Sequence, residues 1–228
     1  IAVPQVELGH GVFTTLAQIV ADELGADWRT VAVETAVGRG FGNAVLSAEW
    51  RDGLGNTLPA VFESGFPDEF IATGGSSSIR AFEEPLRNAG ATAAALLCSA
   101  AAARWDIDRH ACETHDGFVW FGEQRTRFGE IAREAAAFAI PSDIAWRRGN
   151  ANRLVATAMP RLDLPAKVDG SVNFAGDIRL PDMVYASLTS GPGGKAKLVS
   201  FDEAAARRVT GVLDIVRTDD WVAVAATN

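Results

Sequence analysis

Two short stretches of the sequence place glycines and small polar residues directly before an apolar helical pattern. The first is Gly9-His10-Gly11, and the second is Thr73-Gly74-Gly75-Ser76-Ser77-Ser78. The start of a helix leaves backbone N–H groups free and carries a partial positive charge, glycines let a ligand approach the backbone, and serines add hydroxyl donors. Both stretches are therefore candidate sites for a phosphate-like anion. The alternative for either stretch alone is structural, with serines that cap a helix and glycines that form a tight turn.

Three known motifs are not matched by the sequence. Neither glycine stretch is followed by Gly-Lys-Ser/Thr, so neither is a Walker loop. The stretch GRGFGN (residues 38–43) lacks the glycine spacing of a dinucleotide fingerprint, and we interpret it as a flexible loop. The stretch HACETH (residues 110–115) holds two histidines and a cysteine but not the paired cysteines of a structural zinc site, so no metal site is predicted there.

Composition restricts the class of protein. The chain has 228 residues with 48% apolar content, enough for the core of one large domain or two small ones. Its formal charge of −8 and its lack of a Lys/Arg cluster argue against a binder of duplex nucleic acid. No run of 18 apolar residues occurs, so no transmembrane segment is predicted. An anionic ligand would have to be held by local backbone and hydroxyl donors.

The elements that would position the two glycine stretches follow from hydrophobic periodicity. Leu16, Ile19, Val20 and Leu24 recur at three and four residues, which predicts a helix from about Val12 that ends at a Gly25 cap. The remaining predictions for the first part of the chain are a strand at 30–35, an irregular region at 37–72, a helix at 79–105 kinked or divided at Pro85, a hairpin at 112–121 around Asp116-Gly117 and a short helix at 128–138.

A polar stretch at residues 141–150 predicts a linker between a first domain, 1–140, and a second, 151–228. The second domain is predicted to contain short strands at 172–174, 183–188 and 196–199, a helix at 201–208, and closing strands at 212–217 and 221–225. The fold class is therefore α/β, with an α+β second unit. Because the chain starts and stops on strand-like residues, we expect it to be a fragment of a longer polypeptide or one part of a larger assembly.

Three blocks of sequence resemble one known family. VELGHGVFTTLAQIVADELGADW resembles the VEMGQGVxTxxAxIVAEELDADW signature of the molybdenum hydroxylases. The likeness is to their large (beta) subunits of the isoquinoline 1-oxidoreductase and membrane-associated aldehyde dehydrogenase type, within the xanthine oxidase family. TGGSSSIRAFEEPLRNAGATAAALL is similar to TGGSxSVRxxxxxLRxAGAxARxxL of the same group, and PRLDLPAKVDGSVNFAGDIRLPDMVYASL resembles the start of its aldehyde oxidase a/b hammerhead domain.

The resemblance implies a cofactor and its contacts. In that family the two glycine-rich stretches contact the pterin and phosphate of molybdopterin, which is often present as its cytosine dinucleotide. His10 stands where the family has glutamine, and a neutral imidazole can likewise donate and accept a hydrogen bond. The family's catalytic glutamate lies in a C-terminal region without a counterpart here, so no catalytic residue and no metal ligand is assigned. The implied cofactor-binding residues are Gly9, His10, Gly11, Thr73, Gly74, Gly75, Ser76 and Ser77.

The resemblance also implies a function. Residues 1–140 would be a partial molybdopterin-binding domain and residues 151–228 the hammerhead domain of an oxidoreductase large subunit. The intact enzyme would hydroxylate an aldehyde or N-heterocycle with water, and would pass electrons to a small subunit with [2Fe-2S] clusters. The expected partners are that subunit and the remainder of the large subunit, the expected compartment is the periplasm, and the chain alone would be inactive. The alternative is a non-catalytic subunit-interaction module, which exposed strand edges and a large apolar patch would favour.

Overall fold

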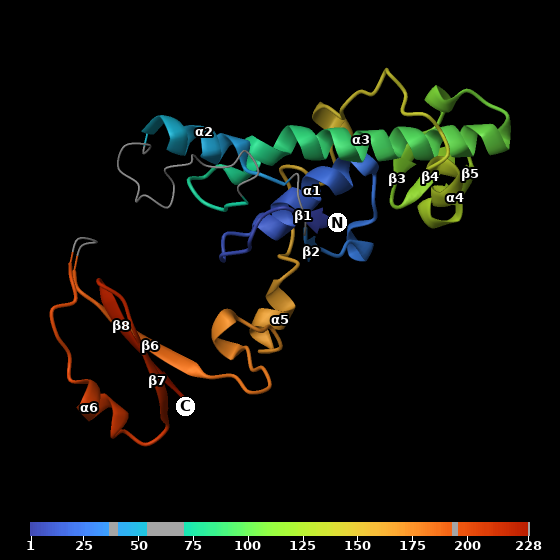
Figure 1. The fold of residues 1–228 in the computed structure, drawn as a ribbon. Helices are drawn as coiled ribbons and strands as arrows, with labels where there is room; N and C mark the ends of the chain where they lie inside the picture. Colours follow the sequence, from blue (N-terminus) through green and yellow to red (C-terminus); the bar gives the residue numbers. More distant parts are fainter. Residues whose placement is uncertain (37–40, 54–70, 193–195, 228) are drawn as a thin grey trace. The chain divides into compact units, whose positions relative to one another are not determined.

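The computed structural model describes residues 1–36, 41–53, 71–192 and 196–227. The chain divides into two compact units, Ile1–Asp169 and Gly170–Asn228. Both units contain helical and strand segments, which confirms the mixed α/β class (Figure 1). In the described part of the chain, no helix has both the length and the apolar character to cross a membrane.

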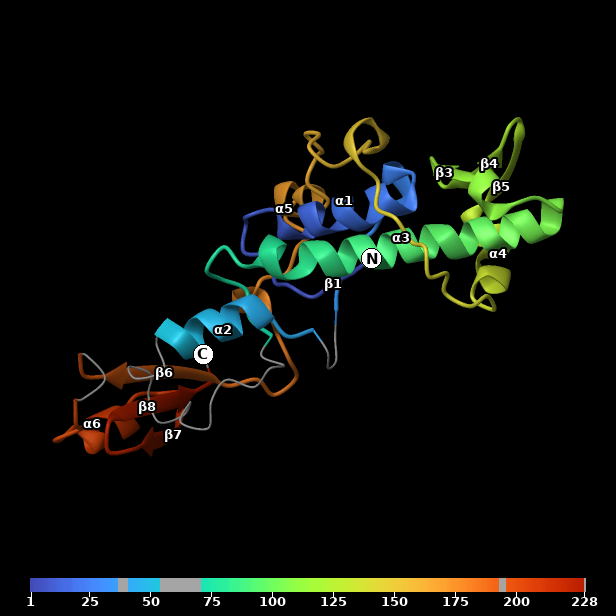
Figure 2. The ribbon, with the colours of Figure 1, turned by 90° about the horizontal axis from the view of Figure 1, so that it is seen from above.

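Two helices form the frame of the first unit, α1 (Val12–Leu24) and α3 (Ser78–Trp105). As predicted, α1 ends at Gly25, whose φ of 74° lies in the left-handed region that favours glycine. Helix α3 continues through Pro85 as one element, so of the two predicted alternatives, a kink or a division at Pro85, the division does not occur. Both views show α1 and α3 side by side and starting toward the same end (Figure 1 and Figure 2).

The packing of α1 against α3 depends on a glycine. A Cβ atom added at Gly90 of α3 would lie 2.7 Å from the Val20 carbonyl oxygen and 2.8 Å from the Glu23 Cβ, both on α1. Real Cβ atoms do not approach other atoms so closely, so a side chain at this position would push the helices apart. Gly90 therefore allows the close approach of the two helices.

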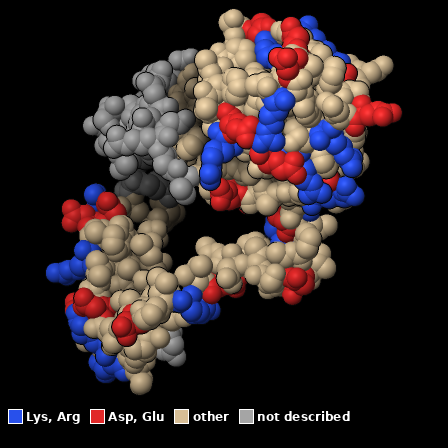
Figure 3. Space-filling model, turned by 90° about the vertical axis from the view of Figure 1, so that its right-hand side faces the viewer, with Lys and Arg blue, Asp and Glu red and all other residues tan. Residues whose placement is uncertain are grey.

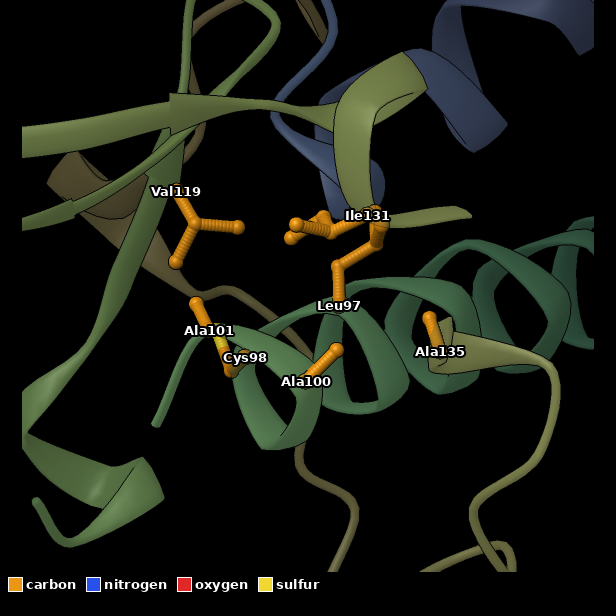
Figure 4. Packing of buried hydrophobic residues seen from close by; sticks show 7 residues of the cluster. All are labelled: Leu97, Cys98, Ala100, Ala101, Val119, Ile131 and Ala135. Carbon is orange, nitrogen blue, oxygen red and sulfur yellow. The ribbon is translucent and has the colours of Figure 1, made fainter. Parts of the chain in front are cut away.

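Two apolar clusters lie along α3. The cluster near its start joins α1 to α3 and contains Val3, Val12, Leu16, Ile19 and Phe82. The second lies farther along α3, where α4 (Phe128–Ala135) and a small sheet pack on it (Figure 4). Its members are Leu97, Cys98, Ala100, Ala101, Val119, Ile131 and Ala135. The two clusters secure both ends of α3 within the first unit.

The sheets of the first unit are small. Strand β1 (Ala2–Val3) pairs in parallel with β2 (Glu34–Thr35), so only the end of the strand predicted at 30–35 forms. The other sheet has the antiparallel order β3 (Glu113–His115), β4 (Phe118–Phe121) and β5 (Gln124–Arg127). The turn between β3 and β4 falls at Asp116-Gly117, as predicted, and both residues have positive φ. Short 3-10 helices cover Trp28–Thr30, Arg109–Ala111, Gly149–Ala151 and Ala175–Asp177.

The region predicted to be irregular, 37–72, contains a helix. Helix α2 covers Ala44–Gly53, while residues 37–40 and 54–70 lie outside the described residues. Asn43 explains its start, because the Asn43 side-chain oxygen accepts a hydrogen bond from the Leu46 N–H at 3.0 Å. Asparagine is a favoured residue at this capping position. The sequence prediction missed α2 because the surrounding glycines outweighed a short apolar pattern.

Residues 153–162, which we name the strap, run along one face of α1. That face carries Thr14, Gln18 and Asp22, which are spaced by four residues and therefore lie in one row. The Asp22 carboxylate accepts hydrogen bonds from three successive backbone N–H groups of the strap, at 2.8, 3.0 and 3.2 Å. The Gln18 amide donates to two strap carbonyls, and the Thr14 hydroxyl accepts from the Leu162 N–H at 3.0 Å.

The strap belongs to the first unit, so the boundary between the two units lies later in the sequence than predicted. The sequence predicted a linker at 141–150 and a second domain from residue 151, whereas the units meet at Asp169 and Gly170. Residues 141–169, including helix α5 (Leu164–Val168), belong to the first unit. The physical reason is the row of polar side chains on α1, which satisfies the backbone of a segment without regular structure.

The second unit is a three-stranded antiparallel sheet with one short helix, α6 (Glu203–Arg207). The strands β6 (Tyr185–Ser190), β7 (Val212–Arg217) and β8 (Trp221–Ala226) lie in the order β6-β8-β7. The strands predicted at 212–217 and 221–225 are confirmed, and β6 begins two residues later than predicted. The predictions of strands at 172–174 and 196–199 are wrong, because neither segment pairs with a neighbouring strand.

Candidate functional site

The two glycine stretches meet at the end of the first unit where α1 and α3 begin. We name residues 9–11 the first loop and residues 73–78 the second loop. The Val6 N–H, just before the first loop, donates to the Thr73 hydroxyl of the second at 2.8 Å. The buried Gln5 side chain donates to the Ala72 carbonyl at 3.2 Å and accepts from the Ser78 hydroxyl at 2.8 Å. The loops are therefore neighbours in space, as a ligand shared between them requires.

The first loop already contains its own anion. The Glu7 carboxylate accepts hydrogen bonds from the backbone N–H groups of Gly9 at 2.7 Å, Gly11 at 3.0 Å and Phe13 at 3.2 Å. Burial disfavours the charged carboxylate, but these donors outweigh it and hold the pKa of Glu7 below its ordinary value. The prediction that the amides of this loop are free for a phosphate is therefore corrected, because a buried side chain takes that place. Glu7 is a turn carboxylate, and its side chain is only 7% exposed.

The His10 side chain projects from this loop and is 43% exposed. Its Nδ1 atom accepts a hydrogen bond from the Leu8 N–H at 3.3 Å and lies 3.5 Å from the Glu7 carboxylate. In a neutral imidazole with Nδ1 as acceptor, the proton is carried by Nε2. The two flanking glycines have φ of 100° and 81°, values that a side chain would strain, and a Cβ added to either would meet no atom within 4 Å. The glycines thus serve the turn itself, and the imidazole is the group that this loop offers to a ligand.

The second loop presents two exposed residues at the start of α3. Gly75 and Ser76 have positive φ of 59° and 51°, and the Ser77 N–H closes the turn on the Gly74 carbonyl at 3.1 Å. Ser77 is fully buried, and its hydroxyl donates to the same Gly74 carbonyl at 2.7 Å. Of the predicted contacts in this loop, Gly74, Gly75 and Ser76 remain accessible to a ligand. The hydroxyls of Thr73 and Ser77 take part in internal bonds.

Two further side chains fix the second loop from opposite sides. The buried Asn43 amide donates to the Ala72 carbonyl at 3.0 Å and to the Ser77 hydroxyl at 2.7 Å. On the outer side, the Arg80 guanidinium donates to the carbonyl oxygens of Gly75 and Ser76 at 3.2 and 3.3 Å. Arg80 also pairs with Glu49 of α2 at 2.7 Å. The loop is thus held in place before any ligand arrives.

The strap reaches the first loop through Arg161. Its guanidinium donates to the Gly9 carbonyl at 2.7 Å and lies 3.3 Å from the Glu7 carboxylate. It also forms two hydrogen bonds with Asp163, at 3.0 and 2.7 Å. Those bonds from Arg161, together with Lys167, outweigh burial and hold the pKa of Asp163 well below its ordinary value.

Chemically, the site offers hydrogen-bond donors and no free carboxylate among its described residues. Glu7 is used by backbone amides and Glu49 by Arg80. On the face drawn in Figure 3, basic and acidic side chains are interleaved over the first unit, so an anion would be held by the local donors of the loops. Such a site can bind and orient an anionic cofactor.

The stretch HACETH has other roles. His110 lies 3.2 Å from the Asp143 carboxylate, while His115 pairs with Asp116 and stacks on Trp120 with ring centroids 4.7 Å apart. Among the described residues, no cluster of three or more His, Cys, Asp or Glu side chains could hold a metal ion. Burial raises the pKa of the Cys112 thiol above its ordinary value.

A cavity of about 510 Å³ lies elsewhere in the first unit, along the middle of α3. Ala94, Cys98, Arg109 and Arg147 are among its lining residues, and no residue of either loop is. Two of its arginines are already engaged, since Arg109 pairs with Asp143 and Arg147 donates to the Thr114 carbonyl at 2.5 Å. We therefore place the candidate site at the loops and not in this larger hollow.

Sequence reasoning missed four residues that build the site, namely Gln5, Glu7, Asn43 and Arg161. For two of them a signal was present. A glutamate two residues before the first glycine can fold back onto helix amides, and an asparagine directly before α2 has the position of a cap. Gln5 and Arg161 act on partners far along the chain, which local patterns do not reveal.

Comparison with known proteins gives three relatives, and no protein-family model matches the chain. The beta subunit of isoquinoline 1-oxidoreductase from Brevundimonas diminuta is 30% identical over 98% of this chain. One of the subunits of nicotinate dehydrogenase from Pseudomonas putida is 30% identical over 97% of the chain. A membrane-bound aldehyde dehydrogenase of Gluconacetobacter polyoxogenes, whose name carries pyrroloquinoline quinone, is 25% identical over 96%. The chain spans 31%, 17% and 27% of these three proteins, respectively.

Proposed function

We propose that this chain, which belongs to the molybdenum hydroxylase family, forms part of the molybdopterin site in the large subunit of an oxidoreductase. The substrate class would be an aldehyde or an N-heterocycle. The observation that carries the proposal is the meeting of the two loops, tied together by the bond from the Val6 N–H to the Thr73 hydroxyl. A single cofactor can touch both loops only if they lie side by side. The names of the relatives support oxidation as the chemistry.

The residues fit such a cofactor with a division of roles. The second loop suits its phosphate, because Gly75 and Ser76 are exposed at the start of the 28-residue helix α3, whose dipole favours negative charge. The first loop suits the pterin, because Glu7 occupies its amides and His10 offers a hydrogen bond. When bound, the cofactor supplies two-electron oxidation of the substrate with oxygen from water. The residues of this chain bind and orient the cofactor.

Further parts of the enzyme belong to the proposal. Because the chain spans less than a third of the first relative, the catalytic base would come from elsewhere in a longer polypeptide, and this chain alone would be inactive. Electrons would leave through a small subunit with [2Fe-2S] clusters, the cofactor would take its cytosine dinucleotide form, and the periplasm would be the compartment. The second unit would be the hammerhead domain, with its start at Gly170 instead of residue 151.

One observation favours the alternative of a non-catalytic interaction module. On one face of the second unit's sheet, Leu188 and Val216 flank Ala223 in register. Leu188 is 57% exposed and Val216 is 48% exposed, and no described residue of the second unit is buried. An exposed apolar strip of this kind is suited to contact with a partner protein. A protein that assembles through this face yet carries no cofactor would support the alternative.

The test is the cofactor content of the full-length protein that carries this chain, purified from cells supplied with molybdate. Molybdenum per chain and the released pterin are measured for the wild type, for Ser76→Glu and for Ser142→Glu. Ser76→Glu puts a carboxylate where the phosphate would lie, and we expect it to lower cofactor content about tenfold, which corresponds to ~1.4 kcal/mol. Ser142 is exposed and remote from the loops, so its matched variant should behave as wild type.

The same preparation decides between cofactors. Chromatography of the released small molecules separates a pterin from a quinone, which matters because one relative's name carries pyrroloquinoline quinone. A wild-type protein that holds quinone and no pterin would refute the proposal. Equal molybdenum content in both serine variants would refute the role given to the second loop.

A further inference from the structure

Arg161 joins two distant blocks of the sequence, since it stands 152 residues after Gly9. The strap is fixed along α1 by Asp22, Gln18 and Thr14, and it ends with the Arg161 guanidinium against the first loop. Arg161 binds two acceptors there, the Gly9 carbonyl at 2.7 Å and the Glu7 carboxylate at 3.3 Å. The guanidinium also donates to Asp163, which is itself paired with Lys167.

The Glu7 carboxylate and the Gly9 carbonyl set the shape of the first loop. Glu7 gathers the N–H groups of Gly9, Gly11 and Phe13 around one carboxylate. This folded turn brings the Leu8 N–H to the Nδ1 atom of His10. Removing the arginine would leave a buried carboxylate and a carbonyl each without one donor, and the turn would lose the contact that closes it on the strap.

We propose that Arg161 is a positioning residue, which locks the first loop so that His10 keeps Nδ1 as an internal acceptor and presents its Nε2–H to the ligand. It follows that the ligand atom opposite His10 is a hydrogen-bond acceptor, such as a carbonyl or an ionised oxygen. The nature of the ligand rests on the proposed function. The effect of Arg161 on the first loop and the tautomer of His10 do not depend on it.

The test uses nuclear magnetic resonance of the 228-residue chain without ligand, at about pH 8.5, where imidazoles are neutral. The chain has only three histidines, so the ring nitrogens of His10 can be assigned by a His10→Gln variant. We compare the wild type with Arg161→Met, Arg161→Lys and Arg133→Met. Arg133 is exposed on α4, away from the loops, and serves as the matched control.

In the wild type, the His10 Nδ1 should be unprotonated and the amides of Leu8, Gly9 and Gly11 should exchange slowly. Arg161→Met should speed exchange of these amides about tenfold and shift the Nδ1 resonance, while amides in the middle of α1 keep their rates. Arg161→Lys should restore part of the protection, because an ammonium can still reach one of the two acceptors. Arg133→Met should change nothing.

Two results would overturn the inference. One is an Arg161→Met chain in which the loop amides and the His10 ring are unchanged. The other is faster exchange spread evenly over α1, which would mean that Arg161 contributes only to overall stability. If Arg161→Met does not fold, Arg161→Lys serves as the test by itself. If the proposal holds, the amides of the first loop exchange faster in Arg161→Lys than in the wild type, while the amides of α1 remain protected. The cofactor analysis of the serine variants is independent of all these results, so failure of the lock and failure of the proposed function can be told apart.

Discussion

Gly90→Ala tests the packing that brings the two loops together. The added Cβ would stand 2.7 Å from a backbone oxygen and 2.8 Å from a Cβ of α1, so the helices must separate. Overpacking of this kind costs about 1–3 kcal/mol, and a larger cost is expected where backbone is the obstacle. Replacing a helical glycine by alanine returns about 1 kcal/mol of helix propensity. We therefore expect a net destabilisation of about 1–2 kcal/mol.

The matched control is Gly129→Ala in α4, where an added Cβ meets no atom within 4 Å. That change should leave stability unaltered or raise it by up to about 1 kcal/mol. The assay is urea unfolding of the 228-residue chain followed by circular dichroism at the helix band, with both variants at one protein concentration. If Gly90→Ala were as stable as Gly129→Ala, the close approach of α1 and α3 would be refuted.

Three further predictions concern the strap, the acidic groups and the thiols. Asp22→Ala removes the acceptor of three strap amides. In hydrogen exchange the Leu154 and Val155 amides should then exchange faster, and the free energy of unfolding should fall by about 2–4 kcal/mol. Glu84→Ala, an exposed control, should change neither quantity. Glu7 and Asp163 have lowered pKa values in the folded chain, so their stabilisation is present above their ordinary pKa values of 4.5 and 3.8 and is lost as the pH falls. The urea midpoint should therefore decrease below about pH 5, and it should decrease less steeply with pH in Glu7→Gln. An equally steep decrease in that variant would contradict the lowered pKa of Glu7. Burial raises the pKa of Cys98 to about 12. At about pH 8 a thiol reagent should therefore label Cys112 first and Cys98 only after unfolding. Labelling of Cys98 before unfolding would show that the second apolar cluster is open to the reagent.

Local signals account for the parts of the fold that the sequence predicted. Helix α1 combines an apolar repeat with a glycine cap, and the hairpin at Asp116-Gly117 follows from its turn residues. Strands β7 and β8 are long apolar runs with a clear turn between them. In each case the information lies within a few residues, so no distant partner has to be known.

The strap and the lock on the first loop could not be predicted in this way. Thr14, Gln18 and Asp22 look like ordinary surface positions of an amphipathic helix, and only the structure shows that an irregular segment more than 130 residues away satisfies them. The two unformed strands show the same limit, because an apolar run becomes a strand only where a partner offers hydrogen bonds. The anion site was predicted by type, but the sequence does not say that the anion of the first loop is Glu7.

In the proposed function, both loops face one molybdopterin. Its most direct test is a crystal structure of the full-length protein that carries this chain, with diffraction recorded at the molybdenum absorption edge. We predict one anomalous peak at the end of the first unit formed by residues 9–11 and 73–76, with the cofactor phosphate at Gly75 and Ser76 and a hydrogen bond from the His10 Nε2–H. A molybdenum peak away from both loops, or a cofactor that touches only one of them, would contradict the claim.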